Sequence, residues 1–382
     1  MDYLGNVLVR SDMNVPISNS IVLDDYRIKK AAEIIPLIKD KSKSVTFISH
    51  LGRPESYTEE LSLKNIVSSL SKYISTKINF VNDIDAEKIS KTLLSANEFN
   101  IYLLENLRFY EGEENNDSSF AIKLASSFDT YIFDAFGSAH RNHSSVVKIG
   151  SYLNSYQGPL VDREIFELKR ITDTEGEPLT LILGGAKISD KLHLIIKLLP
   201  KVDTLLIGGA MCFTFFKAMG INIGSSLYEE DMIVECKKII QDKNFKKIKL
   251  PLDIGVIKSI ESNNRTDVSY EEICDNNIGI DIGNRTVELF SEYINKAKII
   301  FWNGPMGIFE KKNFNTGTRD ITRLVQNTEA HTIIGGGDTV SAIRKFGDID
   351  LFNYVSTGGG ASLEYLEGRE LPGINKYPSL II

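Results

Sequence analysis

Five basic residues stand where short apolar runs of the sequence end or where a helix is expected to begin. They are Arg27, His50, Arg53, Arg108 and Arg141. Arginine forks bind phosphate or carboxylate oxygens in bidentate fashion. Basic groups gathered on one sheet edge repel one another until an anion offsets their charge. We therefore expect a site for a small molecule that carries both a phosphate and a carboxylate.

The residues around these cations suit the same site. VLVRSDMNVP places Asp12 and Asn14 after the first strand, and SHLGRP places Gly52 between His50 and Arg53. Asp12 and Asn14 can orient hydroxyl groups or an arginine, and a glycine allows backbone N–H groups to approach a phosphate closely. The ordinary alternatives are an Asx turn at Asp12 and a plain glycine turn at Gly52.

Arg27 is expected in the first turn of a helix. LDDYRIKKAAEIIPLIKD has an apolar face of helical period and offers Asp24 or Asp25 as its N-cap. A cation in a first turn opposes the helix dipole by a few tenths of a kcal/mol, so a nearby carboxylate or a bound anion must offset it. The alternative to an anion ligand is a solvated Arg27 paired with Asp24.

Two histidines, His140 and His143, follow the strand TYIFDAF, which also carries Asp134. A zinc site is the obvious alternative for such a pair. No cysteine or acidic residue stands at ligand spacing beside them, so we do not expect zinc there.

The second half of the chain offers glycine-rich turns instead of cations. LTLILGGAKISDKL runs from a strand into Gly184 and Gly185, and we predict that Lys187 and Lys191 lie on one face of the following helix. A glycine turn into a helix N-terminus is a ready anion site. The alternative is tight strand-to-helix packing with solvated lysines.

Three further runs add to this glycine-rich edge: LLIGGA, FWNGPMGIFE and TIIGGGDTV. The last resembles a phosphate loop with a magnesium carboxylate, Asp338, although Asp338 is equally a candidate helix N-cap. No GxxxxGK[ST] loop is present, and Val340 stands where the last glycine of GxGxxG would fall. General NTPases and dinucleotide-dependent dehydrogenases are therefore disfavoured.

Alternation of short apolar runs with helical periodicity predicts an α/β protein with parallel sheets. The 382 residues exceed one hydrophobic core, since a domain takes about 150 residues, so we expect two domains. The junction is expected at 158–175, where GPLVDREIFELKRITDTE is typical of a helix that ends in a polar link. The expected strands are 6–10, 44–49, 78–81, 101–106 and 130–136, then 179–185, 204–209, 247–253, 297–304, 331–337 and 353–359.

Composition restricts the class of protein further. A net charge of -7 argues against a protein that wraps nucleic acid. The three cysteines form no CxxC pair and are too few for a disulfide framework. The first twenty residues lack the apolar run of a signal peptide, and no segment reaches the roughly 18 apolar residues of a membrane span. We expect a cytoplasmic protein without a membrane partner.

Nine motifs of this chain resemble the successive signatures of the phosphoglycerate kinases, in that family's order and over nearly the whole chain. They are VLVRSDMNVP, DDYRI, SHLGRP, LLENLRF, DAFGSAHR, GGAKISDK, FWNGPMGIFE, GGGDT and STGGGASLEYLEG. The resemblance implies two Rossmann-like domains with parallel sheets joined by a helical hinge, in a monomer. It implies a phosphoglycerate-binding domain at 1–157, a hinge helix at 158–175, a nucleotide-binding domain at 176–360, and a segment at 361–382 that returns to the first domain.

The resemblance also implies a role for each site residue. The residues expected to bind 3-phosphoglycerate or 1,3-bisphosphoglycerate are Asp12, Met13, Asn14, Arg27, His50, Leu51, Gly52, Arg53, Arg108 and Arg141. Those expected to bind ATP or ADP are Gly184, Gly185, Lys187, Lys191, Gly208, Asn303, Pro305, Glu310, Gly335, Gly336, Gly337, Asp338 and Thr339, with Asp338 holding Mg²⁺.

Arg27 and Lys187 are the residues implied to be catalytic. A loose, in-line transition state spreads charge over three equatorial oxygens, so it needs positioned cations more than a nucleophile. The acceptor is already a carboxylate, so no general base is needed and His50 is interpreted as a substrate ligand. The two sites belong to separate domains, so transfer implies closure about the hinge.

The chain departs from the family's usual pattern at four places. They are Phe133, the run 161–165, Ser225 and Asn284. None removes an expected phosphate ligand, although Ser225 puts one contact near the nucleotide in doubt and the run 161–165 lies in the expected hinge. A non-catalytic relative would be expected to lack Lys187, Asp338 or Arg27, and all three are present.

Overall fold

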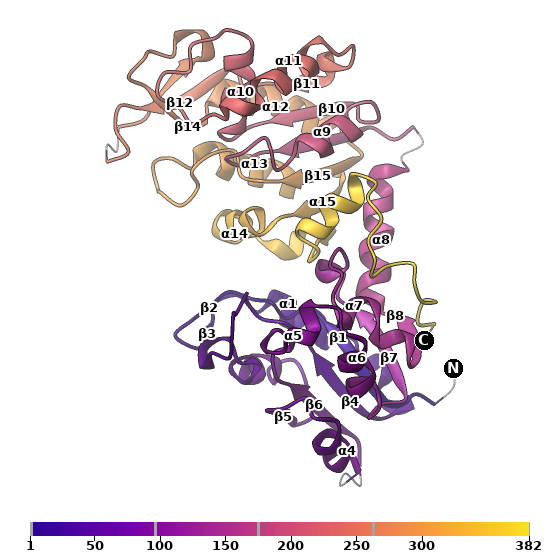
Figure 1. Ribbon diagram of the computed structural model, residues 1–382. Helices are drawn as coiled ribbons and strands as arrows, with labels where there is room; N and C mark the ends of the chain where they lie inside the picture. The colour runs from indigo at the N-terminus through magenta and orange to yellow at the C-terminus, as the bar shows by residue number, and fades with distance from the viewer. Residues whose placement is uncertain (1–2, 95–97, 174–175, 262–263, 382) are drawn as a thin grey trace. The chain divides into compact units, whose positions relative to one another are not determined.

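The computed structural model describes residues 3–94, 98–173, 176–261 and 264–381 (Figure 1). Its contacts divide the chain into two compact units. Unit 1 comprises Met1–Ile165 and Glu370–Ile382, and unit 2 comprises Phe166–Arg369. No helix in the described ranges is long and apolar enough to cross a membrane.

Unit 1 is built on a six-stranded parallel sheet. Its neighbouring strands are β5 (Ile78–Val81), β6 (Asn100–Leu104), β4 (Ser42–Ile48), β1 (Gly5–Ser11), β7 (Thr130–Asp134) and β8 (Asn154–Gln157). Arg10 of β1 pairs with Ile48 of β4, and Ser11 pairs with Asp134 of β7. The carboxyl ends of the central strands therefore meet at one edge, where open parallel sheets bind ligands.

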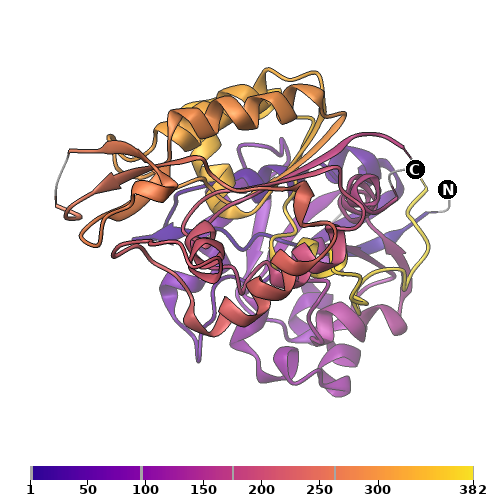
Figure 2. The same ribbon diagram turned by 90° about the horizontal axis from the view of Figure 1, so that it is seen from above.

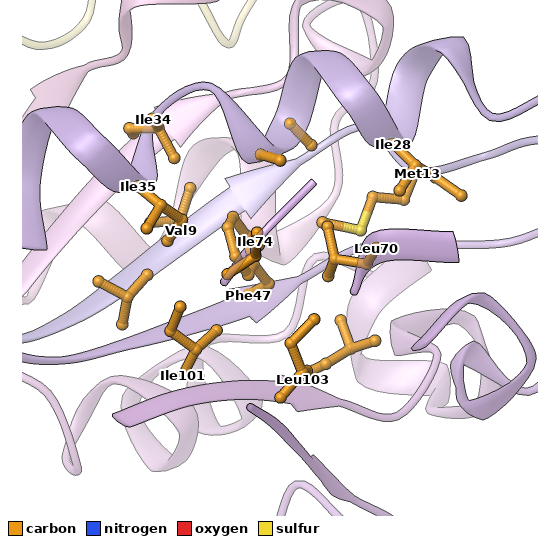
Figure 3. Close-up of a cluster of buried hydrophobic side chains, with 14 of the residues drawn as sticks. Val9, Met13, Ile28, Ile34, Ile35, Phe47, Leu70, Ile74, Ile101 and Leu103 are labelled. Atoms are coloured by element: carbon orange, nitrogen blue, oxygen red, sulfur yellow. The ribbon is translucent and has the colours of Figure 1, made fainter. Parts of the chain in front are cut away.

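Short helices and an apolar core hold this sheet. The helices are α1 (Tyr26–Ala32), α2 (Ile35–Ile38), α3 (Val67–Leu70), α4 (Ala86–Leu94), α5 (Glu111–Glu114), α6 (Ser118–Ala125) and α7 (Ser144–Val147), and a small ribbon joins β2 (Ile17–Ser18) to β3 (Ile21–Val22). Val9, Phe47 and Leu103 come from three adjacent strands and pack with Ile28 and Ile35 of α1 and α2 (Figure 3). Burying each such side chain contributes roughly 1.5–3 kcal/mol, so this core fixes the strands whose ends carry the polar residues.

Unit 2 has a second six-stranded parallel sheet. Its neighbouring strands are β11 (Ile248–Lys249), β10 (Thr204–Ile207), β9 (Leu179–Leu183), β15 (Ile299–Asn303), β16 (His331–Gly335) and β17 (Tyr354–Val355). Leu183 pairs with both Ile207 and Asn303, and Asn303 pairs with Gly335. Four strands thus end level with one another, and a glycine follows Ile207, Leu183 and Asn303.

The helices of unit 2 are α9 (Leu192–Leu198), α10 (Met211–Ala218), α11 (Ile233–Gln241), α12 (Asn284–Lys296), α13 (Thr316–Gln326), α14 (Gly337–Phe346) and α15 (Gly360–Leu366). Helices α12 and α13, in orange, lie side by side (Figure 2). A separate antiparallel sheet contains β13 (Thr266–Ser269), β12 (Asp253–Ile257) and β14 (Ile278–Ile282).

The expected fold class, α/β with two parallel-sheet domains, is confirmed. The single strand predicted at 247–253 is wrong. The chain there forms the two-residue strand β11 and then, after Pro251, enters β12 of the antiparallel sheet. Proline cannot donate to a ladder, which explains the break. Strands β8 and β13 were not predicted, because their short polar sequences, NSYQ and TDVS, lack an apolar run. Strand β14 was not predicted either, although its sequence IGIDI alternates apolar residues with Gly279 and Asp281.

Helix α8 (Pro159–Thr172) contains the point at which the chain leaves unit 1. The buried Asp134, at the end of β7, begins this helix: its Oδ1 accepts hydrogen bonds from the backbone N–H of Leu160 (2.8 Å) and Val161 (3.3 Å). The C-terminal segment, in yellow, reaches β8, where the Gln157 N–H donates to the Pro378 carbonyl at 2.8 Å (Figure 1). Residues 174 and 175, the end of the expected hinge, lie outside the described residues.

Burial raises the pKa of Asp134 to about 7. Because its folded pKa lies above its ordinary value of 3.8, the carboxyl contributes stability that is fully present below that value and is lost as pH rises through 7. Asp134→Asn keeps the acceptor oxygen and removes the titration. We expect the variant to match the wild type near pH 4 and to be more stable at pH 8, by roughly 4 kcal/mol, which corresponds to the rise of the pKa from 3.8 to about 7.

Urea unfolding followed between pH 4 and pH 8 measures this difference. The exposed Asp40 provides a matched control, and Asp40→Asn should leave the pH dependence unchanged. A constant offset between Asp134→Asn and the wild type over the whole range would contradict the titration of Asp134.

Candidate functional site

The five expected cations of unit 1 gather at the carboxyl ends of β1, β4, β6 and β7. Their proximity shows in the pKa values. Burial and the charges of Arg141, Arg10 and Arg53 lower the pKa of Arg108 to about 10, partly offset by Glu114. Burial and the charge of Arg53 lower the pKa of Arg141, and the charge of Glu114 partly offsets this shift. The cations repel one another, so the cluster is poised for an anion with several charges.

Arg27 extends from the first turn of α1 and is held by a carboxylate. Its NH1 group lies 3.0 Å from Asp12 Oδ2 and also donates to the Asn14 carbonyl at 3.3 Å. The predicted alternative of a pair with Asp24 is wrong, because Asp24 Oδ1 instead accepts from the Tyr26 N–H at 2.9 Å. About a third of the Arg27 side chain, 29%, remains exposed. The strand end at Asp12 thus positions Arg27.

His50 is buried at the end of β4 and is neutral. Burial, followed by the charges of Arg10, Arg108, Arg141 and Arg27, holds its pKa well below the usual range. Its Nδ1 atom lies 3.1 Å from NH2 of Arg10. Guanidinium groups only donate hydrogen bonds, so Nδ1 is the acceptor and Nε2 carries the hydrogen. His50 is therefore a hydrogen-bond donor through Nε2.

The loop after β4 requires glycine at position 52. Gly52 has a φ of 64°, and a Cβ atom there would lie 2.8 Å from Leu61 Cδ2. Its N–H donates to Asn14 Oδ1 at 2.9 Å, and its carbonyl accepts from Arg108 NH1. The glycine turn therefore links the ends of β1, β4 and β6, in addition to any role toward a ligand.

Arg108 is buried, Arg141 is half-buried and Arg53 is exposed. The Arg108 side chain is 2% exposed and its Nε atom lies 3.2 Å from Glu114 Oε1. The half-buried Arg141 follows the 3₁₀ turn Phe136–Ser138, and its N–H donates to the Ser138 carbonyl at 3.0 Å.

Met13 and Leu51 lie in the hydrophobic core of unit 1, so their side chains do not face a polar ligand. The Met13 N–H donates to Ser49 Oγ at 2.9 Å. The backbone of Leu51 is paired on both sides with the side chain of Asn106. These residues fix the loops that carry the cations.

Arg10, Glu113 and His143 belong to this cluster although the sequence did not single them out as ligands. Arg10 is 1% exposed, and its NH2 group contacts the His50 ring. Burial and neighbouring cations lower the pKa of His143 to about 4, and its Nδ1 lies 3.8 Å from Glu113 Oε1. The only available signal was the arginine inside the apolar run VLVRS. No group of three potential metal ligands occurs in the part of the chain that the structure describes.

In unit 2, glycines line the ends of four neighbouring strands, and there the loops pack backbone against backbone. A Cβ atom on Gly184 would lie 2.1 Å from the Pro305 carbonyl oxygen, and one on Gly304 would lie 2.3 Å from the Gly184 carbonyl oxygen. A Cβ on Gly208 would lie 2.6 Å from Met306 Sδ. Larger residues at these positions would force the loops apart.

Hydrogen bonds tie this edge to α14. The Gly304 N–H donates to Thr339 Oγ1 at 2.7 Å, and the buried Asn303 side chain lies against Gly335 and Gly336. Gly336, with a φ of 88°, is the N-cap of α14, which begins at Gly337. Asp338 is therefore not the N-cap, and its exposed carboxylate lies in the first turn.

Lys187 and Lys191 do not share a helix face, and that prediction is wrong. Helix α9 begins at Leu192, with Lys191 as its N-cap in a non-helical conformation. The segment 184–191 is a longer turn, because Gly184 and Gly185 bind the 303–305 loop before the helix starts. Lys187 is exposed, whereas Lys191 is buried and burial lowers its pKa.

A cavity of about 530 Å³ opens beside the glycine edge of unit 2. Four of the expected nucleotide residues line it: Gly185, Pro305, Glu310 and Asp338. Most of its wall is apolar and was not predicted; it includes Phe213, Leu227, Ile254, Ile278, Ile280, Ile308 and Phe309. An apolar slot with a few polar groups at its rim suits a planar ring carrying an anionic tail.

Several residues of this wall belong to the antiparallel sheet. The pattern that predicts parallel strands does not predict this sheet. Ser225 also lines the cavity, and its Oγ donates to the Asp275 carbonyl at 3.0 Å. Asp281 of β14 lines it as well, held at 2.8 Å by Arg265 NH1.

Comparison with known proteins agrees with this arrangement. The family model described as phosphoglycerate kinase matches residues 4–369. A phosphoglycerate kinase of Dictyoglomus turgidum is 44% identical over 372 residues, which is 96% of this chain and 94% of that protein. One of Rubrobacter xylanophilus is 42% identical over 374 residues, with 97% and 95% covered.

Solved structures give the same result. The phosphoglycerate kinase from Coxiella burnetii superposes with a TM-score of 0.85 at 35% identity, covering 98% of this chain and 96% of that one. The enzyme from Pyrococcus horikoshii gives a TM-score of 0.84 at 27% identity, with 98% and 95% covered. With two α/β units, a cation cluster, a glycine-lined cavity and these relatives, the chain belongs to the phosphoglycerate kinase family of enzymes.

Proposed function

We propose that this protein catalyses the reversible, Mg²⁺-dependent transfer of a phosphoryl group between ATP and the carboxylate of 3-phosphoglycerate, giving ADP and 1,3-bisphosphoglycerate. The direction, glycolytic or gluconeogenic, follows metabolite levels. The observation that carries the proposal is the cation cluster of unit 1. Its charges suit a ligand with two anionic groups, which 3-phosphoglycerate has.

In this proposal different residues of the cluster bind the two ends of the substrate. Arg53, Arg108 and Arg141, which act on one another's pKa values, bind the phosphate that is not transferred. Arg27, oriented by Asp12, lies toward the carboxylate and the transferring phosphoryl group. Neutral His50 donates a hydrogen bond through Nε2 and moves no proton, because a carboxylate acceptor has none to lose.

The nucleotide is proposed to bind in unit 2. The adenine ring would enter the apolar cavity, and the phosphates would lie along the glycine edge near Lys187 and Lys191. Lys191 keeps its charge beside Asp190 and Asp338, although burial lowers its pKa. In-line transfer then requires the two units to bring their ligands into contact with water excluded.

Asp338 fits a magnesium ligand. Mg²⁺ is usually held by one or two carboxylates together with substrate phosphates and water, rather than by an all-protein cage. An exposed carboxylate that lines the cavity matches that donor set. When bound, the ion would neutralise charge on the phosphates, and Asp338 would orient it.

A coupled assay with ATP, Mg²⁺ and 3-phosphoglycerate tests the proposal directly. Turnover is expected for the wild type. A folded sample without turnover, but with ligands still bound, would instead indicate a non-catalytic relative.

Arg27→Ala is expected to lower kcat about a hundredfold, because removing one preorganised donor to the developing charge costs roughly 3 kcal/mol. The same coupled assay measures it. Lys29→Ala, on the same helix and exposed, should leave kcat near the wild-type value. If the two variants behave alike, Arg27 does not stabilise the transition state.

Asp338→Asn is expected to raise the Mg²⁺ concentration needed for half-maximal rate about tenfold, which corresponds to about 1.4 kcal/mol. The KM for 3-phosphoglycerate should stay unchanged because that ligand binds in unit 1. Magnesium titrations of the coupled assay give both values. An unchanged magnesium requirement would remove Asp338 from the metal site.

A further inference from the structure

A series of hydrogen-bonded buried polar groups leads to His50 in the cation cluster of unit 1. Arg10, on β1, donates from Nε to Ser145 Oγ at 2.9 Å. Ser145, on α7, donates in turn from Oγ to Glu113 Oε1 at 2.5 Å, while its backbone N–H donates to Glu113 Oε2 at 2.9 Å. The Ser145 hydroxyl thus links Arg10 to Glu113 through two hydrogen bonds.

The members of this series are shielded from solvent. Arg10 is 1% exposed, and Ser145 and Glu113 are 0% exposed. A buried ionisable group without a hydrogen-bond partner is strongly unfavourable, so Arg10 and Glu113 each depend on Ser145. Burial raises the pKa of the Glu113 carboxyl, and the Arg10 charge and the bonds from Ser145 oppose that rise. The Tyr131 hydroxyl donates to the Ser145 carbonyl and fixes the residue from the sheet side.

At its other end the series reaches His50. Arg10 NH2 lies 3.1 Å from His50 Nδ1 and 3.2 Å from Ser138 Oγ, and NH1 donates to the Ser11 carbonyl. These bonds fix the guanidinium plane in one orientation. Because Nδ1 must accept, His50 is kept as the tautomer with hydrogen on Nε2.

We propose that Glu113 and Ser145 are positioning residues: through Arg10 they hold His50 in the Nε2–H tautomer as a hydrogen-bond donor to the substrate. This inference rests on the proposed function of the cluster. Neither residue touches the substrate. Both act through Arg10, whose charge also adds to the field that attracts the anion.

The alternative is a purely structural role in which the buried network stabilises unit 1 and nothing more. The two roles differ in what a variant changes. Loss of a positioning contact alters the His50 tautomer and weakens substrate binding selectively. Loss of a structural contact lowers stability without a specific effect on His50.

Two matched pairs of variants separate these roles. Glu113→Gln removes the buried charge, and Glu111→Gln removes an exposed charge from the same helix, α5. Ser145→Ala removes the bridging hydroxyl. Ser144→Ala removes an equally buried hydroxyl from the same helix, α7, whose bonds go to the Gly112 and Asp117 carbonyls instead.

The first readout is the nitrogen NMR spectrum of histidine-labelled protein at pH 7, with His50→Gln used to assign the signal. In the wild type we expect a protonated Nε2 and an unprotonated Nδ1. In Glu113→Gln and Ser145→Ala both signals should shift toward those of a mixture of tautomers. Glu111→Gln and Ser144→Ala should retain the wild-type spectrum.

The second readout is the coupled assay. Glu113→Gln and Ser145→Ala should raise the KM for 3-phosphoglycerate roughly tenfold, as expected when one partner of a buried, charge-assisted contact is lost, with the KM for ATP unchanged. Should Glu113→Gln fail to fold, Ser145→Ala carries the test, since it leaves both charges in place.

The outcomes distinguish this inference from the proposed function. Unchanged His50 signals together with an unchanged KM in both variants overturn the positioning role. Equal effects in Ser144→Ala overturn it too, because they indicate general destabilisation. A wild type without turnover refutes the proposed function, while the NMR comparison still decides whether Glu113 and Ser145 control the tautomer.

Discussion

The structure of unit 1 depends on one constraint: several positive charges must be held close together before any anion arrives. Three of the arginines are held by oxygen acceptors that the fold supplies. Arg27 pairs with Asp12, Arg108 pairs with Glu114 and a backbone carbonyl, and Arg10 is bridged to Glu113. The level ends of parallel strands bring these acceptors to one edge. Burial and the charges of neighbouring arginines lower the pKa values of Arg108 and Arg141, and an anionic ligand would relieve the repulsion.

Under the proposed function unit 2 meets a different constraint, since a nucleotide needs backbone N–H groups and an apolar slot rather than a dense cation cluster. Close packing of the glycine loops meets it. The loops at Gly184 and Gly304 lie so close together that neither position has room for a side chain. The hydroxyl of Thr339 accepts a hydrogen bond from the Gly304 N–H and so links the same edge to α14. Such a site is rigid because its contacts are backbone contacts, which have few alternative arrangements.

The sequence predicted what local pattern determines and missed what tertiary contacts determine. Apolar runs that end in polar or glycine residues located most strands of the two parallel sheets. The same reading predicted Arg27 in the first turn of a helix and Asp338 after a strand. The Arg10–Glu113 pair was not predictable, because the two residues come from distant segments and meet only once the sheet forms. Lys187 and Lys191 were predicted on one helix, but they lie in the turn 184–191. Spacing alone does not reveal that Gly185 binds the 303–305 loop before the helix begins. Periodicity also gave no sign of the apolar cavity wall.

In the proposed reaction, transfer to a carboxylate changes what a histidine in such a site contributes. Without a proton to remove, an imidazole contributes only as a hydrogen-bond donor, and a donor must remain in one tautomer. Arg10 achieves this in two ways: its guanidinium occupies Nδ1, and its charge joins burial in keeping His50 neutral. The buried Glu113 then has a purpose that stability alone does not supply. Through Ser145 it supports the positive charge of Arg10 next to the neutral His50. The other cations of the cluster remain available to the substrate.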